Sequence, residues 1–413
     1  MGQTAIVVGA ASIVGDVFGT GNKEALAASL STPMPTGTPI FVLIDLLGGN
    51  DILNTQVPIN DPWYYDNTYG RGSLAIPANL ALPLPGTQFG LHPKLVWMAQ
   101  RWTHGDVAFI QGIGENVKNE FSHFAAMEYK NTADFSYSEP LGWLGRYNDL
   151  AHPGVPVASI SLNNLHRSLV GQQTQMISVR DVQGFALTVD SKAAYGSKFS
   201  NSLSSMVNLN QQGNLKKASQ MIDQTFASSA DVRSSYNAAY NNGNSSGSLA
   251  SQLGMAAMMI VAGLQCQTYV TGMGGFDTHS SQDWQHGDIL SKLDTALQKF
   301  FAIIDASPRA QDVFVMITSE FGRQITTNAG GGTDHGQASH GIVIGGKVRG
   351  GLYGEMPTLN PGGPTRPNRI FDAMRPTTDF RTMYATILNR LGGNSNMTAE
   401  VLKGNFADLG FFL

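Results

Sequence analysis

Six apolar runs rich in β-forming residues, with helix-type patterns between them, constrain the fold of this chain most. The runs cover 38–49, 105–114, 155–162, 266–272, 312–319 and 340–346. Continuous apolar runs are typical of strands that are buried on both faces of a parallel sheet. The helix-type patterns lie at 249–264, 289–306 and 380–393. The sequence therefore predicts an α/β fold, with a mostly parallel central sheet and helices on both faces.

The length fits this prediction without a second core domain. One large α/β domain with insertions can take up most of the 413 residues, and we expect it to cover 36–413. Residues at about 165–248 differ in character, because they are rich in Ser, Asn and Gln and end in the linker-like "NNGNSSGS". We interpret this stretch as a helical insertion or lid on the core sheet.

The composition excludes several classes of function. Charged residues make up only 14% of the chain and the net charge is −4, with no run dense in Lys or Arg. A nucleic acid is therefore not an expected partner, because nothing here would neutralise a phosphate backbone. No G-x-G-x-x-G or P-loop motif is present to predict a nucleotide site. The single cysteine, Cys266, excludes an intrachain disulfide and a cysteine-based zinc site.

The amino-terminal residues 1–35 look like an export signal. The apolar stretch "TAIVVGAASIVGDVFG" leads to "EALAAS", whose small residues resemble a signal-peptidase site. The stretch is too short and too polar to predict a stable membrane span. It has no positively charged region before it, so two interpretations stay open: part of a longer export signal, or an ordinary helix. On the first interpretation, these residues do not belong to the sheet.

Polar and titratable side chains follow several of the predicted strands. They are Asp45, Ser122, Asp277, His279, Glu320, Arg323, Asp334, His335 and His340. Ligands of open α/β sheets bind outside the carboxyl ends of the strands, so these side chains are candidates for one shared site. In particular, we expect Asp277 and His279 to lie within reach of one point shared with Asp45 and Glu320.

Each candidate also has a purely structural interpretation. The pair Asp277 and His279 fits a metal site or a polar surface turn. The stretch 334–340 fits a ligand loop or a mobile glycine-rich surface loop. Ser122 fits a nucleophile at a helix start or a helix N-cap. Arg323 fits a clamp for an anion or a structural salt bridge.

Eight short motifs, in one order along the chain, resemble those of a known family. They are "LLGGNDILNT", "GLHPKL", "QGIG…SHF", "GWLGRY", "FDTHSSQ", "SEFGRQ", "GTDHG" and "VRGGLYG". Through them the region 38–393 resembles the DUF1501 family of exported bacterial proteins, which is distantly similar in fold to the alkaline phosphatase and sulfatase superfamily. Members of the family usually carry a twin-arginine signal, whereas this sequence lacks the arginine pair.

The superfamily likeness implies a metal-dependent site. By position, Asp45 matches an acidic ligand at the end of the first strand, and Ser122 matches the nucleophile at a helix start. The remaining ligands would come from Asp277 with His279, Glu320, Asp334 with His335, and His340, while His123 would be a ligand or a neighbour of one. Phe321 stands where a sulfatase has a histidine, so one metal position is lost or remade. The implied cofactor is a divalent ion: Zn, Ca, Mg or Mn.

Two functions from different classes follow from this resemblance. The first is an exported hydrolase, periplasmic or extracellular, that uses a divalent metal to cleave a sulfate or phosphate ester. Its substrate would be a small anionic ester or a sulfated or phosphorylated glycan. The alternative is a non-catalytic exported structural or surface protein that keeps the fold. Phe321 and the few Lys and Arg residues favour the alternative, whereas the gathered carboxylates and histidines favour the enzyme.

Overall fold

The computed structural model describes residues 6–7, 34–115, 120–153, 158–174, 176–178, 248–261, 263–365 and 373–413. Most of the predicted helical insertion and most of the signal-like segment lie outside these residues. Ile6–Val7 form a short edge strand, β1, which pairs in parallel with β8 (Met176–Ser178). The expectation that the amino-terminal segment stays outside the sheet is therefore wrong for these two residues.

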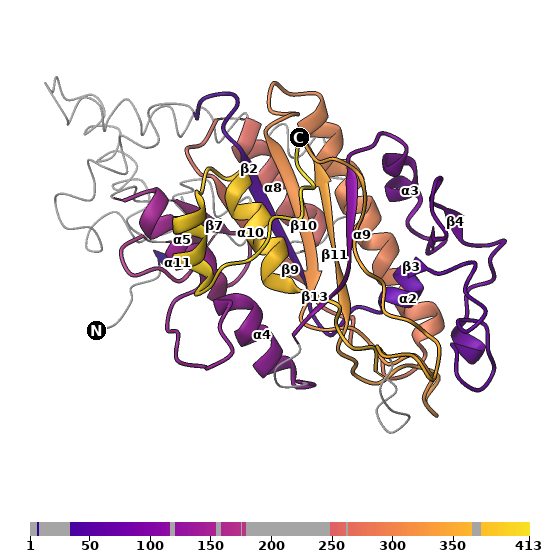
Figure 1. The fold of residues 1–413 in the computed structure, drawn as a ribbon. Coiled ribbons are helices and arrows are strands. Elements are labelled where there is room, and N and C mark those ends of the chain that lie inside the picture. Colours follow the sequence, from indigo (N-terminus) through magenta and orange to yellow (C-terminus); the bar gives the residue numbers. More distant parts are fainter. Residues whose placement is uncertain are drawn as a thin grey trace, which may run out of the picture.

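The predicted central sheet is confirmed (Figure 1). Its strands follow the spatial order β1, β8, β7 (Ser159–Ser161), β9 (Thr268–Met273), β2 (Ile40–Leu46), β10 (Val313–Ser319), β11 (Ser339–Gly345), β6 (Val107–Gly114) and β12 (Gly351–Gly354). A further short strand, β13 (Thr378–Asp379), also pairs with β6. Neighbouring strands from β1 to β10 run parallel, whereas β11 is antiparallel to both of its neighbours. A smaller sheet joins β3 (Gln56–Val57), β5 (Gly90–Leu91) and β4 (Leu82–Pro83).

The central strand β2 is buried on both faces, because its alternate side chains pack into two different apolar clusters. Ile40, Val42 and Ile44 pack into one apolar cluster together with α3 (Val96–Trp102), α8 (Leu249–Val261) and α9 (Gln282–Asp305). Phe41 and Leu43 pack into a second cluster with α5 (Trp143–Ala151), α10 (Phe380–Arg390) and α11 (Ser395–Leu402). Successive strand residues point to opposite faces, so a strand covered by helices on both sides is apolar throughout. The predicted layering of helix, sheet and helix is confirmed (Figure 1).

The parallel strands β9, β2 and β10 end together at one edge of the sheet. The register pairs Asp45 of β2 with Gly272 of β9 and with Thr318 of β10. Helix α4 (His123–Thr132) begins near this edge, and the short helix α2 (Ile52–Thr55) follows β2 there. The loops that leave these strands are therefore close neighbours, and they carry most of the predicted site residues.

Candidate metal centre

Three segments bring their side chains to the carboxyl edge of the sheet. Helix α4 supplies His123 as its first residue, and the loop after β9 supplies Asp277 and His279. The long loop between β10 and β11 folds back on itself, since the Gln324 amide donates to the Asp334 carbonyl at 2.9 Å. This fold-back brings the end of the loop beside its beginning, where Arg323 and His335 form an isolated bridge.

Each of three histidines at this edge has its Nδ1 atom against an acceptor. Nδ1 of His123 lies 2.8 Å from Oε1 of Glu320, and Nδ1 of His279 lies 3.0 Å from Oδ1 of Asp334. Nδ1 of His335 lies 2.8 Å from the backbone carbonyl of Phe121. A carbonyl or an ionised carboxylate only accepts, so each Nδ1 carries the proton. In the neutral form of each imidazole, Nε2 then presents a lone pair, which is the tautomer that a metal ligand needs.

The three Nε2 atoms are turned toward one carboxylate, that of Asp277. Oδ1 of Asp277 lies 3.0 Å from Nε2 of His279 and 3.1 Å from Nε2 of His335, while Oδ2 lies 3.5 Å from Nε2 of His123. His123, Asp277 and His335 each offer a ligand atom within 4.8 Å of the others. The two atoms His279 Nε2 and His335 Nε2 are only 2.9 Å apart. At that distance the two nitrogens share either a proton, in an N–H···N hydrogen bond, or a metal ion.

Arg323 holds the Asp277 carboxylate and the loops around it. Its Nη2 atom donates to Oδ1 of Asp277 at 2.6 Å and to the Phe276 carbonyl at 2.9 Å, and it also contacts the Gly48 carbonyl. Nε and Nη1 donate to the carbonyls of Gly49 and Thr333, both at 2.8 Å. The side chain is completely buried. Its donors are therefore directed at the protein, which is the structural role considered for Arg323 and not the anion clamp.

The environment keeps Asp277 ionised. Partial burial by itself would raise the pKa of this carboxyl, but the hydrogen bond from Arg323 and the positive charge of Arg323 contribute to lowering it to about 2. The pKa of Asp334 is also lowered, first by the hydrogen bond from Asn328 and then by His279. Burial lowers the pKa of His335, which favours its neutral form. A carboxylate beside neutral imidazoles is the protonation state in which a cation can bind.

Glu320 was predicted as a metal ligand, and the structure gives it a different position. Its Oε1 atom accepts from the Gly48 amide at 2.7 Å and faces Nδ1 of His123, while its Oε2 atom accepts from Oγ of Ser319 at 3.0 Å. Glu320 thus contacts His123 at Nδ1, on the side of the ring opposite the Nε2 atom that faces Asp277. Glu320 orients the His123 imidazole, and Asp334 does the same for His279.

Two further predicted ligands lie outside this group. Oδ2 of Asp45 lies 2.9 Å from Nε2 of His166. His340 is buried beside Asn50, whose Nδ2 atom lies 3.5 Å from Nε2 of His340, and burial lowers the pKa of this histidine to about 3. Both displacements follow from strand geometry, because Asp45 and His340 are strand residues that point into opposite layers, whereas the ligand group is built from loops.

Ser122 precedes α4, at the N-cap position that its sequence predicted. Its hydroxyl makes no capping hydrogen bond, and the residue is exposed. Its amide donates to Oε1 of Glu120 at 2.7 Å, so this carboxylate holds the segment just before the helix. The exposed hydroxyl, one residue before His123, is therefore not needed to cap α4.

The sequence analysis left the role of His123 open and did not identify His166 or Lys130. His123 has a recognisable signal, because the first residue of a helix after a sheet strand lies at the ligand-binding edge. His166 and Lys130 have none, since their partners Asp45, Thr318 and Ser319 are distant in the sequence.

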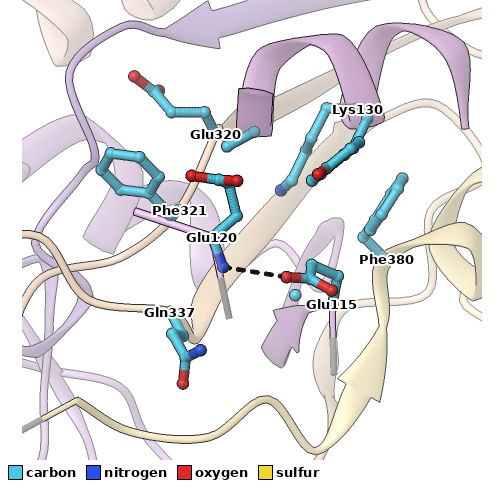
Figure 2. Close-up of a pocket in the computed structure, with 10 residues that line it drawn as sticks. Glu115, Glu120, Lys130, Glu320, Phe321, Gln337 and Phe380 are labelled. Atoms are coloured by element: carbon cyan, nitrogen blue, oxygen red, sulfur yellow. Dashed lines mark hydrogen bonds between the residues drawn. The ribbon is translucent and has the colours of Figure 1, made fainter. Parts of the chain in front are cut away.

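A cavity adjoins the centre, and Figure 2 labels seven of the ten residues that line it. Glu320 and Phe321 form the part of its wall nearest the histidines, since the Phe321 ring centre lies 4.9 Å from that of His123 and 4.8 Å from that of His335. Glu115 and Glu120 line the cavity together, and the Glu120 amide donates to Oε1 of Glu115 at 3.2 Å.

The fold and this site define an α/β protein with a candidate metal centre at the carboxyl edge of its sheet. The chain belongs to the family described as protein of unknown function DUF1501, which matches residues 87–407. This confirms the family that the motifs indicated. No curated protein matches the sequence significantly.

Solved structures align with the chain at low identity. A protein in the alkaline phosphatase superfamily from Vibrio parahaemolyticus is 9% identical, covers 97% of this chain and 80% of its own, and has a TM-score of 0.36. The PsFucS1 sulfatase from Pseudoalteromonas sp. is 11% identical, with coverage of 96% and 80% and a TM-score of 0.35. An alkaline phosphatase from the Antarctic bacterium TAB5 is 10% identical, with coverage of 89% and 99% and a TM-score of 0.33.

Proposed function

We propose that this protein is an exported, metal-dependent hydrolase of sulfate or phosphate esters. One observation supports the proposal most: the Nε2 atoms of His123, His279 and His335 are all directed at Asp277, and two of them are 2.9 Å apart. Their Nδ1 atoms are each tied to an acceptor, so the convergence of lone pairs is built into the loops. Such an arrangement favours a bound cation.

His123, Asp277 and His335 would hold the metal ion, with His279 close enough to join them. Imidazole and carboxylate ligands suit Zn²⁺ better than Ca²⁺ or Mg²⁺, which prefer oxygen ligands. Bound there, a zinc ion would lower the pKa of a water ligand and withdraw charge from an ester oxygen. Arg323 would keep Asp277 ionised and in place for that ion.

Ser122 remains the candidate nucleophile within this proposal, with a water molecule as the alternative. Its exposed hydroxyl adjoins His123 in the chain and makes no capping hydrogen bond that attack would break. Attack by Oγ on phosphorus or sulfur would form the serine ester and release the alcohol, which takes up the serine proton. Water would then hydrolyse the serine ester.

The site is open enough for a large substrate. The side chains of His279, Asp277 and Asp334 are 43%, 48% and 51% exposed. A glycan that carries sulfate or phosphate groups is therefore as accessible a substrate as a small ester. The signal-like residues 1–35 support export. In the part of the chain that the structure describes, no helix is both long and apolar enough to cross a bilayer.

The test is hydrolysis of p-nitrophenyl phosphate and p-nitrophenyl sulfate, with Zn²⁺, Mn²⁺, Mg²⁺ or Ca²⁺ supplied. We expect turnover by the wild type and its loss in His335→Ala. If Ser122 is the nucleophile, Ser122→Ala abolishes turnover while the melting temperature stays within about 2 °C, because the hydroxyl caps nothing. Turnover that survives in Ser122→Ala would assign the attack to water. Absence of turnover with every metal would contradict the hydrolase.

A specific observation favours the second candidate, a non-catalytic metal-binding protein. Arg323 contacts Asp277 of the centre, and Lys130 contacts the Ser319 carbonyl immediately before Glu320. Both side chains are buried, and their donors are directed at protein oxygens. Neither can approach the anionic part of an ester. Metal binding without turnover in the same assays would support this candidate.

A further inference from the structure

We propose that the Lys130 ammonium is a fixed positive charge of the centre, which shares a cavity with the Asp45 and Glu320 carboxylates and takes the place of a second metal ion there. The centre then holds one divalent ion, and Lys130 is a positioning residue. This inference rests on the proposed metal centre and adds the number of ions and the source of the remaining positive charge.

The backbone places Lys130 close to the candidate ligands. It lies in α4, seven residues after His123, and residues seven apart share one face of a helix. Its Nζ atom donates to the Ser319 carbonyl at 2.7 Å and approaches Oγ1 of Thr318 at 3.4 Å. These are the last two residues of β10, so the ammonium lies at the carboxyl edge of the sheet, immediately before Glu320.

Because Lys130 is buried, its positive charge needs negative charges nearby. The residue is only 9% exposed, and among the described residues no carboxylate lies within 4.0 Å of its Nζ atom to form a direct ion pair. A buried cation without a carboxylate in direct contact is unfavourable unless negative charges lie a little further away. Asp45 and Glu320 supply those charges, because both line the same cavity as Lys130.

The contacts of Asp45 keep it out of the ligand group. His166 bonds its Oδ2 atom through Nε2, and Nδ1 of His166 lies 2.7 Å from the hydroxyl of the buried Ser168. Asp45 is therefore held in the cavity beside Lys130, which none of His123, Asp277 and His335 lines. A second divalent ion in that cavity would meet the ammonium at close range, and like charges repel strongly where water is excluded.

The experiment counts zinc ions bound to the full chain by equilibrium dialysis followed by elemental analysis. We expect one ion per chain in the wild type. Lys130→Met removes the charge, keeps a chain of similar length, and is expected to bind a second, weaker ion. The double variant Lys130→Met with Asp45→Asn is expected to return to one, because the carboxylate that would hold the second ion has been neutralised.

Each outcome separates this inference from the proposed function. Two ions in the wild type, or one ion of unchanged affinity in folded Lys130→Met, would overturn the role of Lys130 and leave the metal centre standing. No bound zinc would overturn the proposed centre and this inference with it. If circular dichroism shows Lys130→Met to be unfolded, zinc binding by the single variant Asp45→Asn is the test of the inference. One ion with a Kd within about two-fold of the wild type supports the inference, and loss of the ion overturns it.

Discussion

At the scale of single residues, the direction of each imidazole depends on the contact of its other ring nitrogen. Glu320, Asp334 and the Phe121 carbonyl hold Nδ1 of three histidines, and Nε2 is thereby left facing Asp277. These acceptors contribute as much to the candidate centre as the ligands do, because a freely rotating imidazole loses entropy on binding. Phe321 supports the same geometry by packing against two of the rings.

The first prediction concerns Glu320, whose side chain orients His123. Glu320→Gln removes the negative charge that makes the imidazole a stronger donor, so we expect the Kd for zinc to rise roughly 10- to 100-fold. Isothermal titration calorimetry measures the change. Asp288→Asn is the matched control, because Asp288 is an exposed carboxylate that pairs with Lys292 on the surface of α9. Equal Kd values for the two variants would show that Glu320 does not act on the centre.

At the scale of elements, two glycines after β2 allow the site loops to meet. Gly48 and Gly49 both have positive φ angles, of 123° and 80°. A Cβ atom on Gly48 would lie 2.3 Å from the Asp277 amide nitrogen, and one on Gly49 would lie 2.5 Å from the Phe321 ring. The loop after β2 therefore supports Asp277 and Phe321 directly, and only glycine fits at both positions.

The second prediction separates backbone strain from this close packing. Gly86 has a φ angle of 83°, nearly that of Gly49, but a Cβ atom there would meet nothing within 4 Å. Gly86→Ala should therefore cost only about 1–2 kcal/mol of the free energy of unfolding. Gly49→Ala should cost about 1–3 kcal/mol more, because the added methyl group collides with Phe321. Urea unfolding measures both, and equal losses would mean that the ring moves aside freely.

The elements were far easier to predict from the sequence than the site. Apolar runs mark strands such as β2 and β10 because both faces of those strands are buried, and this requirement is local. The site depends on contacts between distant residues. Sequence order placed Asp45 and Asp277 at the same edge, yet it could not show that Asp45 pairs with His166. Nor could it show that Arg323 is enclosed by four backbone carbonyls.

At the scale of the whole molecule, the protein contains a buried polar network of Asn50, His92, His286 and His340. Asn50 contacts His286 and His340, and the His92 ring lies edge-on to that of His286. Burial lowers the pKa of His92 to about 4, that of His340 to about 3, and that of His286 well below its usual value. These histidines are neutral in the folded protein at pH values where they are charged in the unfolded chain.

The third prediction is a loss of stability in acid. Below pH 6.5 the unfolded chain binds protons that the buried histidines do not, so the free energy of unfolding falls as the pH falls from 6.5 toward 4. Each such histidine contributes a slope of about 1.4 kcal/mol per pH unit. His340→Gln should reduce the slope by about that amount. Unfolding in urea at several pH values measures the slope, and an unchanged slope in His340→Gln would contradict the neutral state of His340.

The central claim is that His123, Asp277 and His335 bind one metal ion, and anomalous X-ray diffraction from zinc-soaked crystals tests it most directly. Data collected on both sides of the zinc absorption edge should give one strong peak per chain. We expect that peak about 2.0–2.2 Å from Nε2 of His123, from Nε2 of His335 and from an Asp277 oxygen. A strong peak at Asp45 or His340 in place of this position, or no peak at all in zinc-saturated crystals, would contradict the account.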